Sequence, residues 1–488
     1  MLVGNRVVLA LFSAAFFLVL AGCGSGGSSP KFALPPTGSF TNASLSGTYA
    51  FSVSGSNQAG FLALAGSLQA DGNGNITSGV EDVNSGTGVF SNVPLSGTYS
   101  VSADGRGLAT LNSNAGNFTI DFVMVSSTRA LAIRFDVNSS ASGTFDKQDS
   151  SAFSTAALTG QYAFSLSGVG ANGGTYQTAG LFIANGGGAL NGGVQDINND
   201  GTVTTSAPMT GAYTVGGSNG RGTLSIITSS GTLSFALYVV DATHLKLIEI
   251  DSVPAIAGDA YRQSGLFSNA SVSGPFAFTL GGGLTGPFVA GGVFTADGSG
   301  TISAGVEDIN SNGSITQNAA TTGTYSIASN GRGTLTLTNS IATFNFSVYP
   351  STGGLLMMGV DSAIPELGAA FLQTGIISAS PASAISGNYG YNLTGVSSSG
   401  QVDSIAHMAA DGSGQFTGAL DINVTGNLSR GLAFNGPYTL ASNGRGAATL
   451  TSSQGKQNLA LYFVSGARVL FIDIDSGLVG VGDFEAQQ

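Results

Sequence analysis

Residues 47–51 read Gly-Thr-Tyr-Ala-Phe, and this short stretch returns three more times along the 488-residue chain. The later copies are Gly-Gln-Tyr-Ala-Phe at 160–164, Gly-Pro-Phe-Ala-Phe at 274–278 and Gly-Asn-Tyr-Gly-Tyr at 387–391. They are spaced by 113, 114 and 113 residues. This period exceeds the roughly 20–50 residues of solenoid and propeller repeats, and each unit is long enough to bury its own core. The spacing therefore predicts four domains arranged as beads on a string with very short linkers.

Three further sequence motifs recur in the same order inside each unit. A second Gly-x-Tyr follows the first, then a Gly-Arg-Gly, and then a strand-like run that ends in Asp. The second tyrosines are Tyr99, Tyr213, Tyr325 and Tyr438. We therefore expect four β repeats, at 40–150, 151–264, 265–376 and 377–488.

The residue pattern inside each unit is that of short β-strands. Apolar Tyr49, Phe51 and Val53 alternate with smaller residues, and such a period of two is typical of half-buried strands. Asn-Gly and Asp-Gly pairs, which suit two-residue hairpin turns, separate the strands. We expect an all-β fold in which each unit is an up-and-down β-barrel, because nearly all connections are short and closure removes exposed edges. The opening strand would then pair with the closing strand around 142–145, and a β-sandwich is the alternative.

Composition excludes several functional classes. The chain holds 76 glycines, no Trp, one Cys and two His, and only 8% of its residues are charged, against about 25% in an ordinary soluble domain. A net charge of −12 disfavours nucleic acid as a partner. One Cys excludes a disulfide framework. His244 and His407 do not recur between units, and no Gly-x-Ser-x-Gly elbow stands between a strand and a helix. We expect neither an enzyme nor a bound cofactor.

The first thirty residues predict export. Arg6 precedes an apolar run at 7–20, which is typical of a secretory signal. The following Leu-Ala-Gly-Cys at 20–23 resembles the lipobox of bacterial lipoproteins. That resemblance implies a lipoprotein signal peptide at 1–22 and a lipid anchor on Cys23, followed by a flexible tether at 23–39. Because Gly24 rather than Asp follows the cysteine, the outer membrane or cell surface is favoured. An ordinary signal peptide with a chance cysteine is the alternative.

The repeats also loosely resemble the calycin plan of lipocalins and avidins. The likeness rests on the opening Gly-x-Tyr strand of each unit and on the expected hairpin-connected barrel. Calycins open on Gly-x-Trp, whereas this chain has no Trp. The resemblance implies a barrel and transfers no binding residue.

Charged residues recur at fixed places in this nearly uncharged chain. The Gly-Arg-Gly arginines are Arg106, Arg221, Arg332 and Arg445. Two sets of aspartates accompany them: Asp82, Asp196, Asp308 and Asp421, and the later Asp136, Asp251, Asp361 and Asp475. Because a guanidinium matches a carboxylate bidentately, we expect a structural ion-pair network that pins register or seals a barrel end. The alternative is a pocket group for an anionic or hydroxylated ligand.

The Asp-Gly turns are weak candidates for calcium binding. Asp71, Asn73 and Asp82 in the first unit, and Asp297 and Asp308 in the third, supply oxygens at spacings that partly match a calcium loop. Position 6 of that loop should be glycine and is Ile76. A hairpin turn without metal accounts for the same residues, and it is the preferred interpretation.

We therefore expect a membrane-anchored surface lipoprotein with a non-catalytic structural, adhesive or multivalent binding role. Its partner beyond the membrane would be a glycan, small molecule or protein of unknown identity. A carrier of small ligands inside barrel cavities is the alternative, and a secreted hydrolase is a third class.

Overall fold

The computed structural model describes residues 39–85, 88–375 and 380–488. The predicted signal peptide, Cys23 and nearly all of the tether lie outside the described residues. Strands dominate the rest, and the helical elements are the short 3-10 turns η1 (Asn42–Ser44), η2 (Ser150–Ala152), η3 (Thr155–Ala157), η4 (Asn269–Ser271) and η5 (Pro381–Ala384). Among the described residues, no helix is long and apolar enough to cross a membrane.

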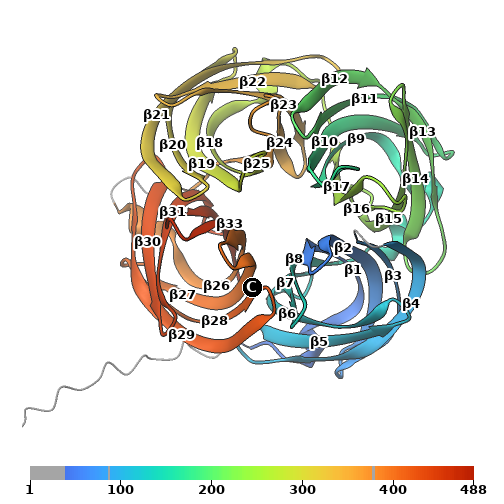
Figure 1. Ribbon diagram of the computed structural model, residues 1–488, viewed down its shortest axis with the longest axis horizontal. Coiled ribbons are helices and arrows are strands. Elements are labelled where there is room, and N and C mark those ends of the chain that lie inside the picture. The colour runs from blue at the N-terminus through green and yellow to red at the C-terminus, as the bar shows by residue number, and fades with distance from the viewer. Residues whose placement is uncertain (1–38, 86–87, 376–379) are drawn as a thin grey trace, which may run out of the picture.

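The strands form four successive barrels (Figure 1). Barrel 1 contains β1 (Ser46–Asn57), β2 (Gly60–Asp71), β3 (Asn75–Ser85), β4 (Gly88–Val101), β5 (Arg106–Ser113), β6 (Gly116–Ser126), β7 (Arg129–Asp136) and β8 (Ser139–Lys147). Barrel 2 contains β9 (Thr159–Val169), β10 (Thr175–Asn185), β11 (Ala189–Asn199), β12 (Thr202–Pro208), β13 (Thr210–Val215), β14 (Arg221–Thr228), β15 (Gly231–Asp241), β16 (His244–Glu249) and β17 (Ala255–Gln263).

The second half of the chain repeats the arrangement. Barrel 3 contains β18 (Ser273–Gly282), β19 (Phe288–Asp297), β20 (Thr301–Ser311), β21 (Ser314–Ile327), β22 (Gly333–Thr338), β23 (Thr343–Ser351), β24 (Gly354–Gly359) and β25 (Glu366–Leu372). Barrel 4 contains β26 (Ser386–Ser397), β27 (Gly400–Asp411), β28 (Gln415–Val424), β29 (Asn427–Leu440), β30 (Arg445–Ser452), β31 (Gly455–Ser465), β32 (Arg468–Asp473) and β33 (Leu478–Ala486).

Each barrel runs up and down, and each strand is antiparallel to the next in sequence except β12, which is followed along the same edge of β11 by β13. The first strand also pairs with the last, and Ser52 lies opposite Thr144 where β1 meets β8. Barrel 2 has one more strand because the long fourth strand of the other barrels is divided into β12 and β13. The predicted all-β fold with closed barrels is confirmed, and the sandwich alternative does not form.

The barrel interiors are packed with aromatic and aliphatic side chains. In barrel 1, the ring of Phe145 lies 5.9 Å from that of Phe51 and 5.8 Å from that of Phe122. One end of each barrel is covered by a 3-10 turn and by the second recurring tyrosine. The tyrosine hydroxyl donates to a backbone carbonyl just after that turn, in the pairs Tyr99–Leu45, Tyr213–Leu158, Tyr325–Val272 and Tyr438–Ile385.

The four barrels stand side by side in a closed ring, so the expectation of independent beads is wrong (Figure 1). Many outward positions are apolar and are buried against the next barrel. Ala63 and Val80 of barrel 1 pack with Tyr238 and Ile248 of barrel 2, and comparable clusters join barrels 2 and 3, 3 and 4, and 4 and 1. Burial of this second apolar face favours association of the barrels.

Candidate functional site

The arginine of each Gly-Arg-Gly motif lies at a junction between barrels. Arg221, at the start of β14, donates from Nε and Nη2 to the two carboxylate oxygens of Asp82 on β3, at 2.8 and 2.7 Å. The same bidentate pair joins barrel 3 to barrel 2 and barrel 4 to barrel 3, as Arg332–Asp196 and Arg445–Asp308, with N–O distances from 2.8 to 2.9 Å. All three aspartates are fully buried. The recurring charges therefore meet between repeats rather than within one.

A tyrosine completes each of these three junctions. Tyr238 lies beside Arg221 on the neighbouring strand, and its hydroxyl donates to Asp82. Tyr349 and Tyr462 make the equivalent contacts in the next two junctions. Burial alone raises the pKa of Asp82, but hydrogen bonds from Arg221, Ser91 and Tyr238 outweigh it and hold that pKa below its usual value. The carboxylate is therefore ionised, and its oxygens are engaged by the protein's own donors.

The junction that closes the ring differs. Val123 pairs with Arg106 where the other barrels have tyrosine, and Arg106 Nη1 lies 3.3 Å from Asp421. Arg430 of barrel 4 is added, with its Nε 3.5 Å from Asp421 and its Nη2 3.2 Å from Asp121. Burial, followed by the charge of Asp421, raises the pKa of Asp121 to about 8.

Two further recurring residues hold the junctions, and sequence reasoning missed both. An asparagine two positions after the Asp82 set donates to carbonyls of the next barrel; these are Asn84, Asn198, Asn310 and Asn423. A glutamine at the end of the last strand, or directly after it, does the same; these are Gln148, Gln263, Gln373 and Gln487. The recurring Asp-x-Asn spacing was visible in the sequence and could have revealed the first set.

The carboxylates of the later aspartates bond within their own barrels, whereas the backbone carbonyls of these residues accept from the junction asparagines of the neighbouring barrel. These carboxylates accept hydrogen bonds from backbone N–H groups of the strand that follows the Gly-Arg-Gly strand, and the pairs are Asp136–Thr119, Asp251–Ser234, Asp361–Asn345 and Asp475–Asn458. Asp136 is also paired with Arg134 at 2.8 Å. The structure does not bring this set together with the Gly-Arg-Gly arginines.

The calcium candidates are also kept apart. Asp71 accepts from the backbone N–H groups of Asn73 and Asn75, and Asp297 does the same for its own turn. Hydrogen bonds, first from the Asn75 side chain, lower the pKa of Asp71. Asp82 and Asp308 lie in the barrel junctions instead. Within the described ranges, no group of three or more His, Cys, Asp or Glu side chains is arranged to hold a metal ion.

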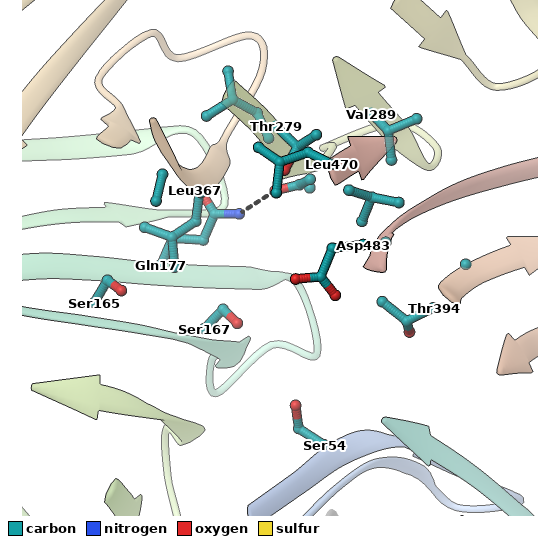
Figure 2. Close-up of a pocket in the computed structure, with 18 of the residues that line it drawn as sticks. Ser54, Ser165, Ser167, Gln177, Thr279, Val289, Leu367, Thr394, Leu470 and Asp483 are labelled. Atoms are coloured by element: carbon teal, nitrogen blue, oxygen red, sulfur yellow. Dashed lines mark hydrogen bonds between the residues drawn. The ribbon is translucent and has the colours of Figure 1, made fainter. Parts of the chain in front are cut away.

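A cavity of about 690 Å³ lies at the centre of the ring and is lined by all four barrels. Its surface is mostly uncharged, with Ser54, Ser165 and Thr394 from three different barrels among the residues drawn in Figure 2. Gln177 also lines it, and its Nε2 approaches the carbonyl of Gly281 at 3.4 Å. The cavity is large enough for a small ligand, since typical ligand sites have volumes of about 300–1,000 Å³.

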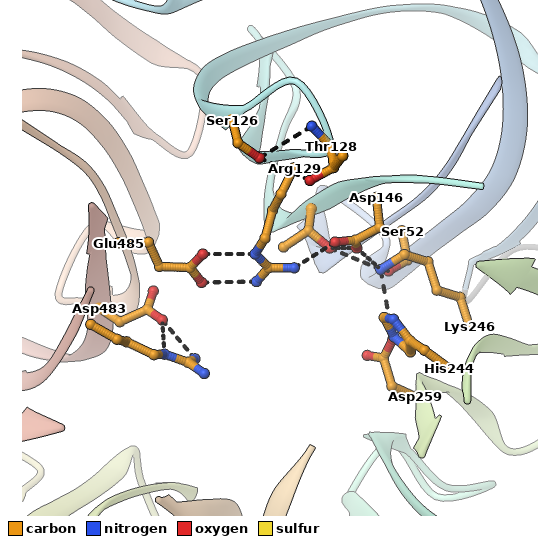
Figure 3. Close-up of polar contacts among 12 residues, drawn as sticks. Ser52, Ser126, Thr128, Arg129, Asp146, His244, Lys246, Asp259, Asp483 and Glu485 are labelled. Atoms are coloured by element: carbon orange, nitrogen blue, oxygen red, sulfur yellow. Dashed lines mark hydrogen bonds and ion pairs between the residues drawn. The ribbon is translucent and has the colours of Figure 1, made fainter. Parts of the chain in front are cut away.

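A chain of ion pairs borders this central cavity (Figure 3). Arg129 of barrel 1 lies 2.7 Å from Glu485 of barrel 4 and 2.6 Å from Asp146 of its own barrel. Lys246 of barrel 2 lies 2.8 Å from Asp146. Burial lowers the pKa of Lys246, but the nearby Asp146 and Asp259 charges outweigh it and raise that pKa above its usual value. The chain therefore joins barrels 4, 1 and 2.

The two histidines have structural partners. His244 Nε2 lies 2.7 Å from Asp259, and the imidazole stacks on Tyr261 with ring centres 4.5 Å apart. His407 is buried, and its Nδ1 lies 2.7 Å from Gln487. Burial is the main cause of its lowered pKa.

Two smaller cavities open at the ends of barrels 2 and 4, opposite the ends covered by 3-10 turns. They have volumes of about 350 and 320 Å³. Their walls are inward-facing side chains of the barrels themselves, including Tyr176 and Ile197 in barrel 2 and Leu393 and Leu450 in barrel 4.

We compared the chain with models of protein families and with curated proteins. No protein-family model matches the chain, and a search of curated proteins finds no match.

Proposed function

We propose that this protein is a non-catalytic binding scaffold of a bacterial cell envelope, tethered to a membrane by lipid on Cys23. The observation that carries the scaffold role is the closed ring, in which buried polar contacts join every barrel to the next. Such a ring holds four barrels in fixed relative positions, so several surfaces and the central cavity are presented together. Multiple weak contacts from one rigid body give avidity.

The lipobox resemblance supports the membrane tether. Two or three acyl chains give stable anchoring, whereas one gives marginal binding. The absence of Asp after Cys23 favours the outer membrane or cell surface as the location.

The anchor is tested by metabolic labelling with an alkyne analogue of palmitate, followed by membrane fractionation. We expect the wild-type chain to carry label and to sediment with membranes, and Cys23→Ala to lose the label and its membrane association. A Cys23→Ala chain that still incorporates label would disprove the anchor. Hydrolysis of a panel of esters, peptides and glycosides by the purified chain would disprove the non-catalytic role.

A second candidate is a carrier of small ligands. It is favoured by the cavities of about 350 and 320 Å³ at the ends of barrels 2 and 4. The aromatic cores of the barrels confine any ligand to these ends.

A further inference from the structure

The cavity at the end of barrel 4 is a largely apolar pocket enclosed by the barrel wall. It lies at the end that carries the hairpin tips at 424–427 and 452–455. Its apolar lining comes from six strands of the barrel and includes Leu393, Val402, Leu420, Ile422, Leu450 and Leu478. With a volume of about 320 Å³, it is at the lower limit for a small-ligand site.

Barrel 4 is hollow here because two interior positions hold smaller side chains than in other repeats. Gln457 lies opposite Leu450, whereas the equivalent residues in barrels 1 and 3 are Phe118 and Phe344. Gly480, opposite Gly395, stands where those barrels have Ala141 and Glu366. The ring that Phe118 and Phe344 contribute in barrels 1 and 3 is therefore missing here, and Phe434 is an aromatic side chain in the wall of the barrel 4 pocket.

Asp473 is the fully buried acid of this pocket, whose polar wall also includes Ser404, Gln457, Asp475 and the solvent-exposed Lys456. One carboxylate oxygen of Asp473 accepts from Gln457 Nε2 at 3.0 Å, and the other accepts from the Asp475 N–H at 2.8 Å. Burial outweighs these hydrogen bonds and raises the pKa of Asp473 to about 7.

No cation of the described chain forms an ion pair with Asp473. In barrel 1 the equivalent position holds Arg134, which lies over the Phe118 ring at 5.1 Å. A buried carboxylate without a paired cation is costly. A ligand that carries a positive charge into the pocket would lower that cost.

We propose that the open end of barrel 4 binds a small apolar amine, with its hydrocarbon part in the cavity and its ammonium group donating to Asp473. This inference rests on the proposed carrier function. Apolar burial supplies affinity, and the charge-assisted hydrogen bond selects amines over neutral molecules of the same shape.

The experiment uses 1-naphthylmethylamine as the probe and 1-methylnaphthalene as its neutral counterpart, with binding to the full chain followed by naphthalene fluorescence and calorimetry. Gln457→Phe places in barrel 4 the residue that barrels 1 and 3 already have. We expect it to abolish binding of both probes at this site. The matched control Leu233→Phe fills the equivalent position of barrel 2, and it should leave binding at barrel 4 unchanged.

Asp473→Asn separates the two parts of the proposal. We expect it to weaken amine binding about tenfold or more, because a hydrogen bond between charged groups is stronger than one between neutral groups, while affinity for 1-methylnaphthalene stays the same. Unfolding midpoints of all variants show whether each is folded.

Three results would overturn the inference, each in a different way. Equal loss of both probes in Asp473→Asn, or no loss of either, would reject amine selectivity and leave the carrier function intact. Wild-type binding by Gln457→Phe would place the site elsewhere. No binding of either probe to the folded wild-type chain would reject both the amine site and the carrier function.

Discussion

At the residue scale, the junctions between barrels depend on a buried arginine–aspartate pair. Asp82, Asp196 and Asp308 are inaccessible to solvent, and each is held by two guanidinium hydrogen bonds and one tyrosine hydroxyl. A buried carboxylate that loses its cation keeps its desolvation cost without compensation. The arginines are therefore necessary partners once the aspartates are buried, whatever net stability the pairs add.

We predict that Arg221→Gln destabilises the protein by about 3–5 kcal/mol, the range expected when one partner of a buried pair is removed. Hydrogen exchange should increase in β3 and β14, and the midpoint of urea unfolding should fall.

Arg106→Gln is the matched comparison. Because Arg430 also approaches Asp421, at 3.5 Å, we expect a smaller loss of stability there. An equal loss at both positions would contradict the role assigned to Arg430 in the closing junction.

At the scale of the elements, the two ends of each barrel differ. One end is covered by a 3-10 turn and a tyrosine, and the other carries buried acids. Burial raises the pKa of Glu81 and Glu307 to about 7 and that of Glu249 to about 9, and neighbouring Asp251 adds to the effect at Glu249. These carboxyl groups are thus held protonated in the folded barrels at pH values where the unfolded chain has lost the proton.

Stability should therefore fall as pH rises from about 5 to 8. In the folded state Glu249 has a pKa of about 9, whereas in the unfolded chain it loses its proton near the ordinary value of 4.5. Between these values the folded state binds more protons than the unfolded state, so the free energy of unfolding decreases as pH rises. The melting temperature measured at pH 5 should exceed that at pH 8.

Glu249→Gln tests the origin of this dependence. The amide cannot ionise, so the difference between the melting temperatures at pH 5 and pH 8 should shrink. The junction carboxylate Asp82, whose pKa is lowered, contributes in the opposite direction and only in acid. An unchanged pH dependence in Glu249→Gln would show that Glu249 is not its source.

At the scale of the whole molecule, the ring depends on hairpin turns that dock on the next barrel. The turns at Gly201, Gly313 and Gly426 have φ of 81°, 85° and 90°. A Cβ atom at Gly426 would meet the backbone carbonyl of Val137 in barrel 1. Glycine is thus required at this turn by its own conformation and by the close approach of the neighbouring barrel.

We predict that Gly426→Ala loosens the junction between barrels 4 and 1 and leaves the separate barrels folded. Hydrogen exchange should rise at the β28–β29 turn and in β7 and β8, and small-angle scattering should report a larger radius of gyration.

Gly455→Ala is the control. Gly455 has φ of 124°, and no atom lies within 4 Å of a Cβ added there. The alanine variant therefore introduces backbone strain but no clash with a neighbouring barrel. If both variants open the ring equally, the strain of the turn and not the docking is responsible.

The sequence by itself determined the four repeats, the all-β class and the up-and-down barrel. These follow from local signals: period-two alternation, Gly-rich turns and short connections, each of which acts within a few dozen residues. It also singled out Arg221 and Asp82, because charges that recur in a nearly uncharged chain stand out. Their meeting between repeats was not visible, since a spacing of about 113 residues does not say whether a residue contacts its own unit or the next.

Only the tertiary structure decided the ring, the central cavity and the open end of barrel 4. Alternation separates the two faces of a strand, but it does not say which outward apolar faces meet. The cavity likewise depends on Gln457, Gly480 and Asp473, which come from different strands and converge only when the barrel closes. The physical reason is the same in both cases. The residue pattern along a short segment determines the strands and turns, whereas the ring and the cavities depend on packing between segments that are far apart in the sequence.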